Sequence, residues 1–403
     1  MTQQPALWVI GTFDTKAQEL LYLARLVRQA GIPVLTVDIG TRSNDSPADL
    51  SADHVAAYHT QGADYVLGGS DRGQAVIAMG QALRNLVSER LAGGAILGVL
   101  GIGGSGGTSM ISPALHVLPY GMPKMLVSTL AAGTVTPFVD IYDIIVVNPV
   151  TDLAGLNRLS RQILANAAHA MVGMLSNPVA VAGNDDRPTL GLTMFGVTTP
   201  CVQAVSRAFD ADYDCQVFHA NGLGGRTLEA LADAGMFKAV LDITTTEVGQ
   251  NLAGGVCDAG PDRLNAAAKR GIPWVGSVGA LDMINWGPPE TIPPQFFGRR
   301  FHVHNAHVTL MRTTADELTR VGLRIAEKLN QSPGPVHLFL PLHGLSAIDA
   351  PGQPFHDPAA NRALFDAIES AFVPTEKHHL HTVPLHINDP DFATLLVQAV
   401  KAL

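Results

Sequence analysis

The stretch Ala95-Ile-Leu-Gly-Val-Leu-Gly-Ile-Gly-Gly-Ser-Gly-Gly-Thr108 decides the fold class, because it joins an apolar run of strand length directly to a glycine-rich turn. A run that is apolar at nearly every position is typical of a parallel strand buried on both faces. The turn places glycines with the spacing GxGxxG at Gly101, Gly103 and Gly106. Between a strand and a helix, this spacing predicts a βα unit whose helix begins at the turn and can face an anion.

The same alternation of short apolar runs and longer stretches with helical spacing continues through the chain. It predicts an α/β fold with mostly parallel sheets and crossover helices. The strands expected in the first half are 7–10, 34–38, 65–67, 95–100, 125–127 and 144–147, with helices at about 14–30, 73–91 and 153–175. The strands expected in the second half are 190–195, 216–220, 239–243, 274–278, 336–340 and 382–385.

A polar, turn-rich segment, Ala182-Gly-Asn-Asp-Asp-Arg-Pro188, interrupts this rhythm. We therefore expect two doubly wound domains, a nucleotide-binding domain over 1–184 and a substrate domain over 185–403. One loop departs from the pattern, because Trp286–Gly298 holds four prolines among apolar side chains. Such a loop cannot be a helix or a central strand, and it suits the wall of a site or a subunit contact.

Composition narrows the class of protein. Among 403 residues, 47% are hydrophobic and only 15% are charged, so there is ample apolar material for two cores. The formal net charge of −9 would repel a phosphate backbone, which argues against nucleic acid as a partner. Three cysteines without a CxxC motif fit free thiols in a reducing compartment, so we expect a cytoplasmic protein. We find no signal peptide and no apolar stretch long enough for a membrane span.

The first candidate anion site is Gly11-Thr-Phe-Asp-Thr-Lys16, at the expected turn from the first strand into the first helix. The loop from Thr12 through Phe13 to Lys16 can present backbone amides at a helix N-terminus, and Lys16 can neutralise a phosphate. Thr12 and Thr15 can donate hydrogen bonds to phosphate oxygens, and Asp14 could bind Mg²⁺. The alternative is that Asp14 or Thr15 only caps the helix while Lys16 is solvated.

The second candidate is the glycine loop of the opening stretch, in which Gly103, Gly104, Ser105, Gly106, Gly107 and Thr108 could cradle a pyrophosphate or triphosphate. Its alternative is a tight turn with nothing bound. The next expected strand ends in Ser128 and not in an acidic residue, so the carboxylate that usually binds the ribose hydroxyls of NAD is absent. A mononucleotide therefore fits this loop better than NAD does. Asp38 could accept from ribose hydroxyls, and Thr41 and Arg72 lie after neighbouring strands, although Asp38 and Arg72 could instead form a surface ion pair.

The second half contains several polar loops after expected strands, which predicts a second, oxygen-rich ligand. The candidate substrate-binding residues are His219, Asn221, Gly224, Gly225, Thr245, Thr246, Asp282, Asn305 and Arg312. Each could instead serve a cap or a turn. The candidates for acid–base catalysis are Glu247, His304 and His386.

Ten of the fifteen histidines lie from His302 onward, so a zinc hydrolase needs weighing. His302, His304 and His307 form HxHxxH on an expected extended segment. No HExxH motif or paired carboxylate accompanies them, and isolated histidines are more often hydrogen-bonding groups than metal ligands. The sequence therefore favours hydrogen-bonding or acid–base roles over zinc.

The sequence resembles the family of the ATP-binding, inhibitory domain of the tomato mosaic virus resistance protein. The resemblance covers essentially the whole chain and rests on blocks in the same order, namely Gly11–Lys16, Gly103–Thr108, Asn221–Arg226, Asp242 with Thr244–Glu247, Ala259–Leu264, Gly279–Met283, His304-Asn305 with Thr309–Thr313, and His386–Pro390. It implies two Rossmann-like α/β domains, a homodimer, and a nucleotide bound by the first domain. The nucleotide contacts it implies are the loop Thr12–Lys16, Thr41, Arg72 and Gly103–Gly106.

These observations predict a protein that binds ATP with Mg²⁺ in the first domain and uses it on a small polar metabolite bound between the domains. A first alternative is a nucleotide-sensing protein without turnover. A second is a hydrolase or lyase in the second domain with ATP only regulatory, and a third is an NAD oxidoreductase.

Overall fold

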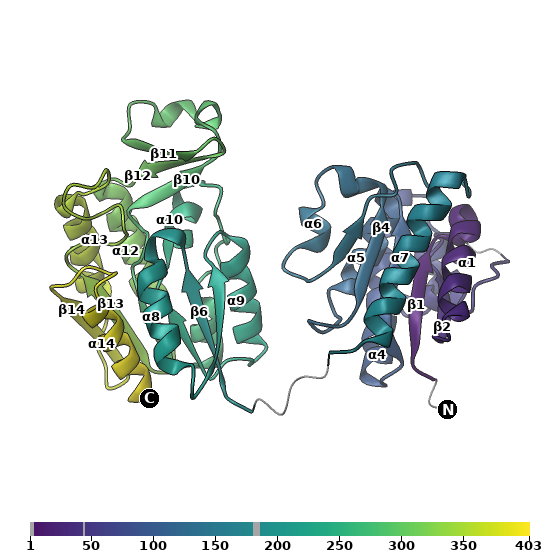
Figure 1. The fold of residues 1–403 in the computed structure, drawn as a ribbon, viewed down its shortest axis with the longest axis horizontal. Helices are drawn as coiled ribbons and strands as arrows, with labels where there is room; N and C mark the ends of the chain where they lie inside the picture. The colour runs from purple at the N-terminus through teal and green to yellow at the C-terminus, as the bar shows by residue number, and fades with distance from the viewer. Residues whose placement is uncertain (1–3, 43–44, 180–185) are drawn as a thin grey trace. The chain divides into compact units, whose positions relative to one another are not determined.

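The computed structural model describes residues 4–42, 45–179 and 186–403, and this part of the chain forms two compact units. The expected boundary after residue 184 falls in the segment 180–185, outside the described residues. Each unit is built on a parallel sheet flanked by helices (Figure 1), which confirms the α/β class and the two Rossmann-like domains.

The N-terminal unit contains a five-stranded parallel sheet with the order β2-β1-β3-β4-β5. The strands are β1 (Ala6–Gly11), β2 (Val34–Asp38), β3 (Ile96–Gly103), β4 (Lys124–Ser128) and β5 (Ile145–Val147). The chain runs outward from β1 to β2 and then returns to the other side of β1, so the strand order reverses between β1 and β3. In open α/β sheets, ligands bind beside the carboxyl ends of the strands at such a switch point.

Helices cover both faces of this sheet. The helices are α1 (Phe13–Gln29), α2 (Ala52–Ala56), α3 (Ala63–Leu67), α4 (Arg72–Ala92), α5 (Ser105–Leu115), α6 (Thr136–Val139) and α7 (Arg158–Ser176), with a 3₁₀ turn η1 (Thr129–Ala132). Because neighbouring strand residues point to opposite faces, Leu7 and Val9 pack against α1 and α7, whereas Trp8 and Ile10 pack with helices that include α4 and α5.

Two sequence-based expectations for this unit are wrong. The segment 65–67 is not a strand but the end of α3, in which Val66 is buried and Tyr65 stacks on His59. Three apolar residues are too few to distinguish a period of 2 from a period of 3.6. The helix expected from residue 153 begins instead at Arg158, because Asn157 caps it by accepting from the amides of Leu159 and Ser160.

The C-terminal unit repeats the same strand order in a six-stranded parallel sheet, β14-β13-β9-β8-β6-β7. The strands are β6 (Thr189–Met194), β7 (Asp214–His219), β8 (Ala239–Asp242), β9 (Trp274–Ser277), β13 (Val336–Pro341) and β14 (His378–Val383). The chain again goes first to an outer strand and then returns, so the switch point of this sheet lies between β6 and β8.

The helices of the C-terminal unit are α8 (Thr199–Phe209), α9 (Leu223–Asp233), α10 (Thr246–Ala253), α11 (Asn265–Arg270), α12 (Ala315–Leu329), α13 (Pro358–Ala371) and α14 (Pro390–Lys401). One apolar core joins α8 and α14 to one face of the sheet. The other joins α9, α12 and α13 to the opposite face. Among the described residues, no helix is both long enough and apolar enough to cross a membrane.

A small antiparallel sheet, β10-β12-β11, is an addition that the strand pattern did not predict. Its strands are β10 (Met283–Trp286), β11 (Phe301–Asn305) and β12 (Val308–Arg312), and Figure 1 shows them at one end of the C-terminal unit. The proline-rich loop lies between β10 and β11 and contains two 3₁₀ turns, η3 (Pro289–Thr291) and η4 (Pro294–Phe296). Another 3₁₀ turn, η2 (Gly196–Thr198), follows β6.

Candidate functional site

A cavity of about 230 Å³ lies at the switch point of the N-terminal unit. The loop after β1, the segment after β2, the start of α4 and the loop after β3 all contribute to it. Its lining includes these residues expected from the sequence: Thr12, Asp14, Thr15, Lys16, Thr41, Arg72, Gly104, Ser105, Gly106 and Gly107. The structure therefore brings residues from four separate segments to one place.

At the amino end of α5, which borders this cavity, the first backbone amides have no hydrogen-bond partner among the described residues. The first backbone bond within this helix joins the Thr108 amide to the Gly104 carbonyl at 2.9 Å, so the amides of Ser105, Gly106 and Gly107 precede the helical ladder. The first turn of α5 contains no acidic residue, and Gly104 has no side chain that could cap it. These groups and the helix dipole favour an anion at this point.

The glycines of the loop fall into two kinds. A Cβ atom on Gly103 would lie 2.8 Å from the backbone of Gly107, so the packing of the protein itself requires a glycine there. A Cβ atom on Gly106 would meet nothing within 4 Å, and one on Gly104 would lie 3.7 Å from the Thr129 hydroxyl. Neither Gly104 nor Gly106 has a positive φ. Packing and backbone conformation thus require neither glycine, and both positions leave room for close approach of a ligand to the backbone.

Two cations and a hydroxyl pair border the cavity. The Lys16 ammonium donates to the Leu153 carbonyl at 2.8 Å, and Arg72 at the start of α4 is exposed and has no hydrogen-bond or ion-pair partner among the described residues. The hydroxyls of Thr12 and Thr15 lie 2.8 Å apart. Asp14 supplies the one carboxylate of the lining, so the described lining carries more positive than negative charge.

Four residues expected to bind the nucleotide lie outside this lining. One Asp38 carboxylate oxygen accepts from the amides of Phe13 at 3.0 Å and Gly40 at 2.8 Å. Asp38 therefore links the loop after β1 to the loop after β2. Its other oxygen is buried without a hydrogen-bond partner among the described residues. Thr108 is buried and its hydroxyl lies 2.7 Å from that of Ser128. Together with Gly103, these residues shape the cavity without facing it.

Val76 and Met110 also line the cavity, and our sequence analysis missed them. Val76 lies four residues after Arg72, and Met110 lies four residues after Gly106. Because residues four apart share one face of a helix, this spacing was the available signal.

At the switch point of the C-terminal unit, the corresponding polar groups are buried and bonded to one another. The hydroxyl of Thr198, after β6, lies 2.7 Å from that of Thr244, after β8. Thr245 donates to the Ser277 carbonyl at 3.0 Å, and Thr246 is fully buried at the start of α10. The expected substrate-binding hydroxyls of Thr245 and Thr246 therefore lie inside the protein.

The candidate catalytic residue Glu247 belongs to a buried ionic network. It accepts from the amides of Gly222 at 2.7 Å and Gly225 at 2.9 Å and from Arg263 Nε at 2.7 Å. The Arg263 guanidinium also donates twice to Asp242, each time at 2.6 Å. Burial by itself would lower the pKa of Arg263, but Asp242 and Glu247 raise it well above its usual value. A glutamate with these partners holds the loop after β7 in place.

The other expected residues of that loop also have partners within it. A Cβ atom on Gly224 would collide with the His219 backbone, and one on Gly225 would collide with the Glu247 carboxylate. The Asn221 side chain accepts from the Gly224 amide at 3.2 Å, and the His219 ring stacks on Phe195. Here the glycines are explained by contacts within the protein.

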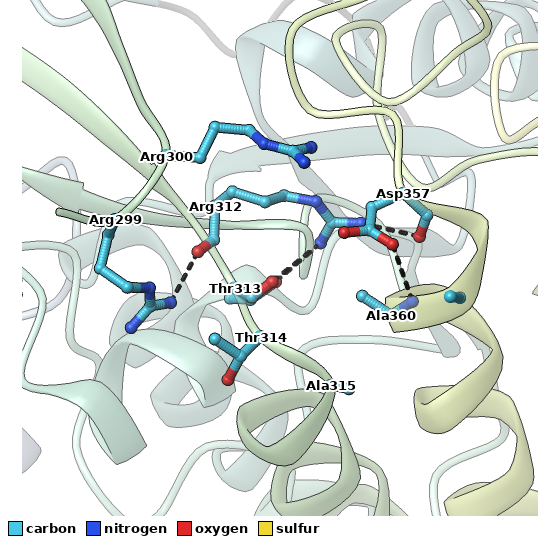
Figure 2. Close-up of a pocket in the computed structure, with 9 residues that line it drawn as sticks. Arg299, Arg300, Arg312, Thr313, Thr314, Ala315, Asp357 and Ala360 are labelled. Atoms are coloured by element: carbon cyan, nitrogen blue, oxygen red, sulfur yellow. Dashed lines mark hydrogen bonds between the residues drawn. The ribbon is translucent and has the colours of Figure 1, made fainter.

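Arg312 lines a cavity of about 410 Å³ near the amino ends of α12 and α13, together with Arg299 and Arg300. Figure 2 shows the Arg312 side chain extending between Thr313 and Asp357, and it donates to the Thr313 hydroxyl at 2.9 Å and to the Asp357 carbonyl at 3.3 Å. The Arg299 guanidinium forms two hydrogen bonds with Glu317. Arg300 donates to the His356 carbonyl at 3.4 Å, so all three arginines have partners within the protein.

Asp282 lies beneath this region and is fully buried. One oxygen accepts from the Ser346 hydroxyl at 2.8 Å, and the other has no hydrogen-bond partner among the described residues. Burial raises the pKa of Asp282 to about 7, the charge of Asp349 adds to this rise, and Arg312 opposes it. The carboxyl of Asp282 therefore keeps its proton to a higher pH than an ordinary aspartate does.

His304 and His386 lie in different surroundings. His304 and Asn305 are exposed near the tip of the β11–β12 hairpin, where the Asn305 side chain accepts from the His307 amide at 2.8 Å. His386 bonds through both ring nitrogens, to the Ser346 carbonyl at 2.9 Å and to the Asn388 amide at 3.1 Å. A carbonyl only accepts and an amide N–H only donates, so the proton is on Nε2 and Nδ1 is the acceptor. Glu247, in the buried network, lies apart from both.

Within the described ranges, no group of three or more His, Cys, Asp or Glu side chains is arranged to hold a metal ion. Asp14 is the carboxylate that lines the cavity of the N-terminal unit, so it is the side chain there that could contact a magnesium ion. Such an ion is commonly held by one or two carboxylates together with substrate phosphates and water.

Comparison with known proteins places this chain among relatives that span its whole length. Family models described as the N-terminal and C-terminal domains of "Uncharacterised protein family (UPF0261)" match residues 5–180 and 187–403. The UPF0261 protein mlr3387 of Mesorhizobium japonicum is 50% identical, over 96% of this chain and 96% of that protein. The UPF0261 protein RA0729 of Rhizobium meliloti is 49% identical, over 98% of each chain.

A plant relative and a solved structure complete the comparison. The ToMV resistance protein Tm-1(GCR237) of Solanum lycopersicum is 39% identical over 99% of this chain, which spans only 56% of the tomato protein. The glycosyltransferase SnogD from Streptomyces nogalater is 11% identical, over 98% of this chain and 99% of that chain, with a TM-score of 0.15 that supports no argument. The two matching domain models and the full-length relatives confirm the expected family link, and the chain belongs to the UPF0261 family.

Proposed function

We propose that the N-terminal unit binds ATP through its phosphate groups and that the protein uses the bound ATP on a small polar metabolite held by the C-terminal unit. The observation that carries the nucleotide half is the pair Gly104 and Gly106, whose lack of a side chain serves no packing need and leaves the start of α5 open. The free amides of α5 and the cations Lys16 and Arg72 would neutralise the phosphates. The resemblance to an ATP-binding family supports the same assignment.

Asp14 would hold Mg²⁺ together with the phosphates in this proposal. When bound, the metal would neutralise charge that develops on the phosphoryl oxygens. The protein's own part is to place the phosphates against the α5 amides and to keep Lys16 within reach of them. Lys16 would exchange its bond to the Leu153 carbonyl for one to a phosphate oxygen.

A nucleotide sensor without turnover is the second candidate, and one observation favours it. Two of the candidate acid–base groups, Glu247 and His386, have all their described bonding positions filled by the protein. A group that is held in this way is poorly placed to exchange protons with a substrate. Conversion of ATP to ADP or AMP, measured in the presence of candidate polar metabolites, decides between an enzyme and a sensor.

The test of nucleotide binding is the substitution Gly106→Ala, with Gly173→Ala as its matched control. Both glycines lie in helices of the N-terminal unit, and a Cβ atom at either position would meet nothing within 4 Å. Replacing a helical glycine by alanine should stabilise each variant by about 0.5–1 kcal/mol. Titration calorimetry should show about tenfold or greater loss of ATP affinity in Gly106→Ala and none in Gly173→Ala.

The opposite outcomes have clear meanings. Equal affinity for ATP in Gly106→Ala and the wild type would remove the phosphate site from this loop. Tighter binding of NAD than of ATP by the wild type would favour the oxidoreductase alternative instead.

A further inference from the structure

The C-terminal unit contains a second cavity, of about 620 Å³, beside the carboxyl ends of β13 and β14. Leu342, Ala350, Pro351 and Pro358 contribute apolar surface to it. Ligands of open α/β sheets lie outside the carboxyl ends of the strands, and this volume is within the range of small-molecule sites. The cavity therefore has the position and the size of a binding site.

Hydrogen bonds hold the walls of this cavity in place. The His386 ring joins the Ser346 carbonyl to the Asn388 amide, so it ties the loop after β13 to the loop after β14. Gly344 lies directly against this ring, and a Cβ atom there would come within 2.6 Å of it. Asn361 is fixed by Arg312 at 2.7 Å and by Asp349 at 2.7 Å. A cavity whose walls are fixed in advance loses little entropy when it binds a ligand.

Three polar side chains of the lining keep free capacity, because the buried Nδ1 of His356 has no hydrogen-bond partner among the described residues, and His343 and Asp389 also keep unused positions. The exposed His343 side chain has no hydrogen-bond partner among the described residues. The Asp389 carboxylate accepts from the His386 amide at 2.7 Å through one oxygen, and its other oxygen has no such partner among the described residues. An imidazole and a carboxylate beside an apolar wall suit a hydroxyl group, because a hydroxyl can donate to either of them and can accept from the imidazole.

The charges of the lining disfavour ligands that carry a charged group. No lysine or arginine lines the cavity, so a carboxylate or a phosphate would find no counter-charge and would meet Asp389. An ammonium group would find Asp389 alone, whose charge already faces the amino end of α14 and the His386 amide. We propose that this cavity binds an uncharged molecule that has an apolar face and carries a hydroxyl group.

This inference deepens the metabolite half of the proposed function by naming its chemical class, and it rests on the C-terminal unit having a ligand of its own. It does not depend on the nucleotide half. The two can fail separately, because Gly106→Ala should leave binding in this cavity unchanged.

The experiment compares four probes that share one aromatic ring, namely benzyl alcohol, benzyl methyl ether, benzoate and benzylamine. Saturation-transfer NMR on the full-length chain should show benzyl alcohol binding best and benzoate worst. The ether cannot donate a hydrogen bond, so it should bind about fivefold more weakly than the alcohol, which is the effect of one hydrogen bond.

Two variants locate the binding. Ala350→Trp should abolish the benzyl alcohol signal by filling the cavity, and His343→Phe should reduce the preference for alcohol over ether. His307→Phe, another exposed histidine, is the control and should change neither. The inference is overturned if benzoate or benzylamine binds best, if no probe binds at millimolar concentration, or if both Ala350→Trp and His343→Phe bind all four probes as the wild type does.

Discussion

The switch points of the two large sheets have the same strand order and opposite surroundings. In the N-terminal unit, the loops after β1 and β3 leave a cavity between them, and the first amides of α5 are unpaired. In the C-terminal unit, Thr198 and Thr244 bond to each other across the corresponding gap. The same topology thus holds an open site in one unit and a closed one in the other.

The glycines of the two units show why the difference matters. Gly225 is required because the Glu247 carboxylate occupies the space that a Cβ atom would need, whereas Gly106 faces open space. Arg263 likewise bonds to three carboxylates, while Arg72 has no such partner among the described residues. A glycine or an arginine in a polar loop therefore indicates a ligand site only where the protein itself does not satisfy it. The predictions below test this distinction.

The largest effect is expected from Arg263→Met in the closed switch point. The substitution leaves the buried carboxylates of Asp242 and Glu247 without their cation, which should destabilise the C-terminal unit by about 3–5 kcal/mol. Hydrogen exchange on peptides of the C-terminal unit measures this loss. Binding of ATP by the N-terminal unit, measured under conditions in which that unit is folded, should be unchanged.

Arg270→Met is the control for this prediction. Arg270 is half exposed and pairs with Asp233 at 3.4 Å, so its loss should cost less than about 0.5 kcal/mol. A loss in Arg263→Met no greater than that in Arg270→Met would show that the closed switch point does not depend on its ion network.

A smaller effect, of the opposite kind, is expected from Arg72→Met in the open switch point. Arg72 is exposed and has no described partner, so the free energy of unfolding should stay within about 0.5 kcal/mol of the wild type. The affinity for ATP should fall about 10- to 100-fold, because one charge-assisted contact to phosphate is lost. Titration calorimetry with ATP measures the change.

The control for Arg72→Met is Arg42→Met, which removes an exposed arginine that does not line the cavity. It should bind ATP with nearly the affinity of the wild type. If both variants lost affinity equally, general attraction between the surface and the nucleotide, and not a defined contact, would explain the effect of Arg72.

Much of this fold could be predicted from the sequence because buried parallel strands have an apolar residue at nearly every position. All the expected strands except 65–67 were found, within a few residues of their predicted ends. The antiparallel sheet of β10, β11 and β12 was missed, because its strands are short and a proline-rich loop separates β10 from β11. The pairing of β10 with β12 joins segments more than twenty residues apart, which local patterns do not record.

The candidate site in the N-terminal unit was easier to predict than that in the C-terminal unit, for a physical reason. The expected phosphate loops lie after adjacent strands, and parallel topology alone brings them to one edge of the sheet. In the C-terminal unit the polar loops also meet at one edge, but the sequence cannot tell whether Glu247 meets a ligand or Arg263. That outcome depends on tertiary contacts between residues 16 positions apart.

A change in pH dependence tests a buried group of the C-terminal unit that lacks a full set of partners. The pKa of Asp282 is about 7 in the folded protein, against an ordinary value of 3.8. Between these two values the folded state retains a proton that the unfolded state releases. The stability of the wild type should therefore fall as the pH rises from about 4 to 7.

Asp282→Asn should remove this contribution, because an amide keeps an acceptor for Ser346 and does not ionise. The stability of the variant relative to the wild type should therefore rise between pH 4.5 and pH 8, because only the wild type carries the group whose ionisation burial opposes. Urea unfolding, followed by hydrogen exchange on peptides of the C-terminal unit, measures the stability at both pH values. Asp212→Asn, at an exposed aspartate, should show no such difference. A stability of Asp282→Asn that falls relative to the wild type over the same pH range would mean that the ionised carboxylate is held by Arg312, and that this group, too, is fully satisfied by the protein.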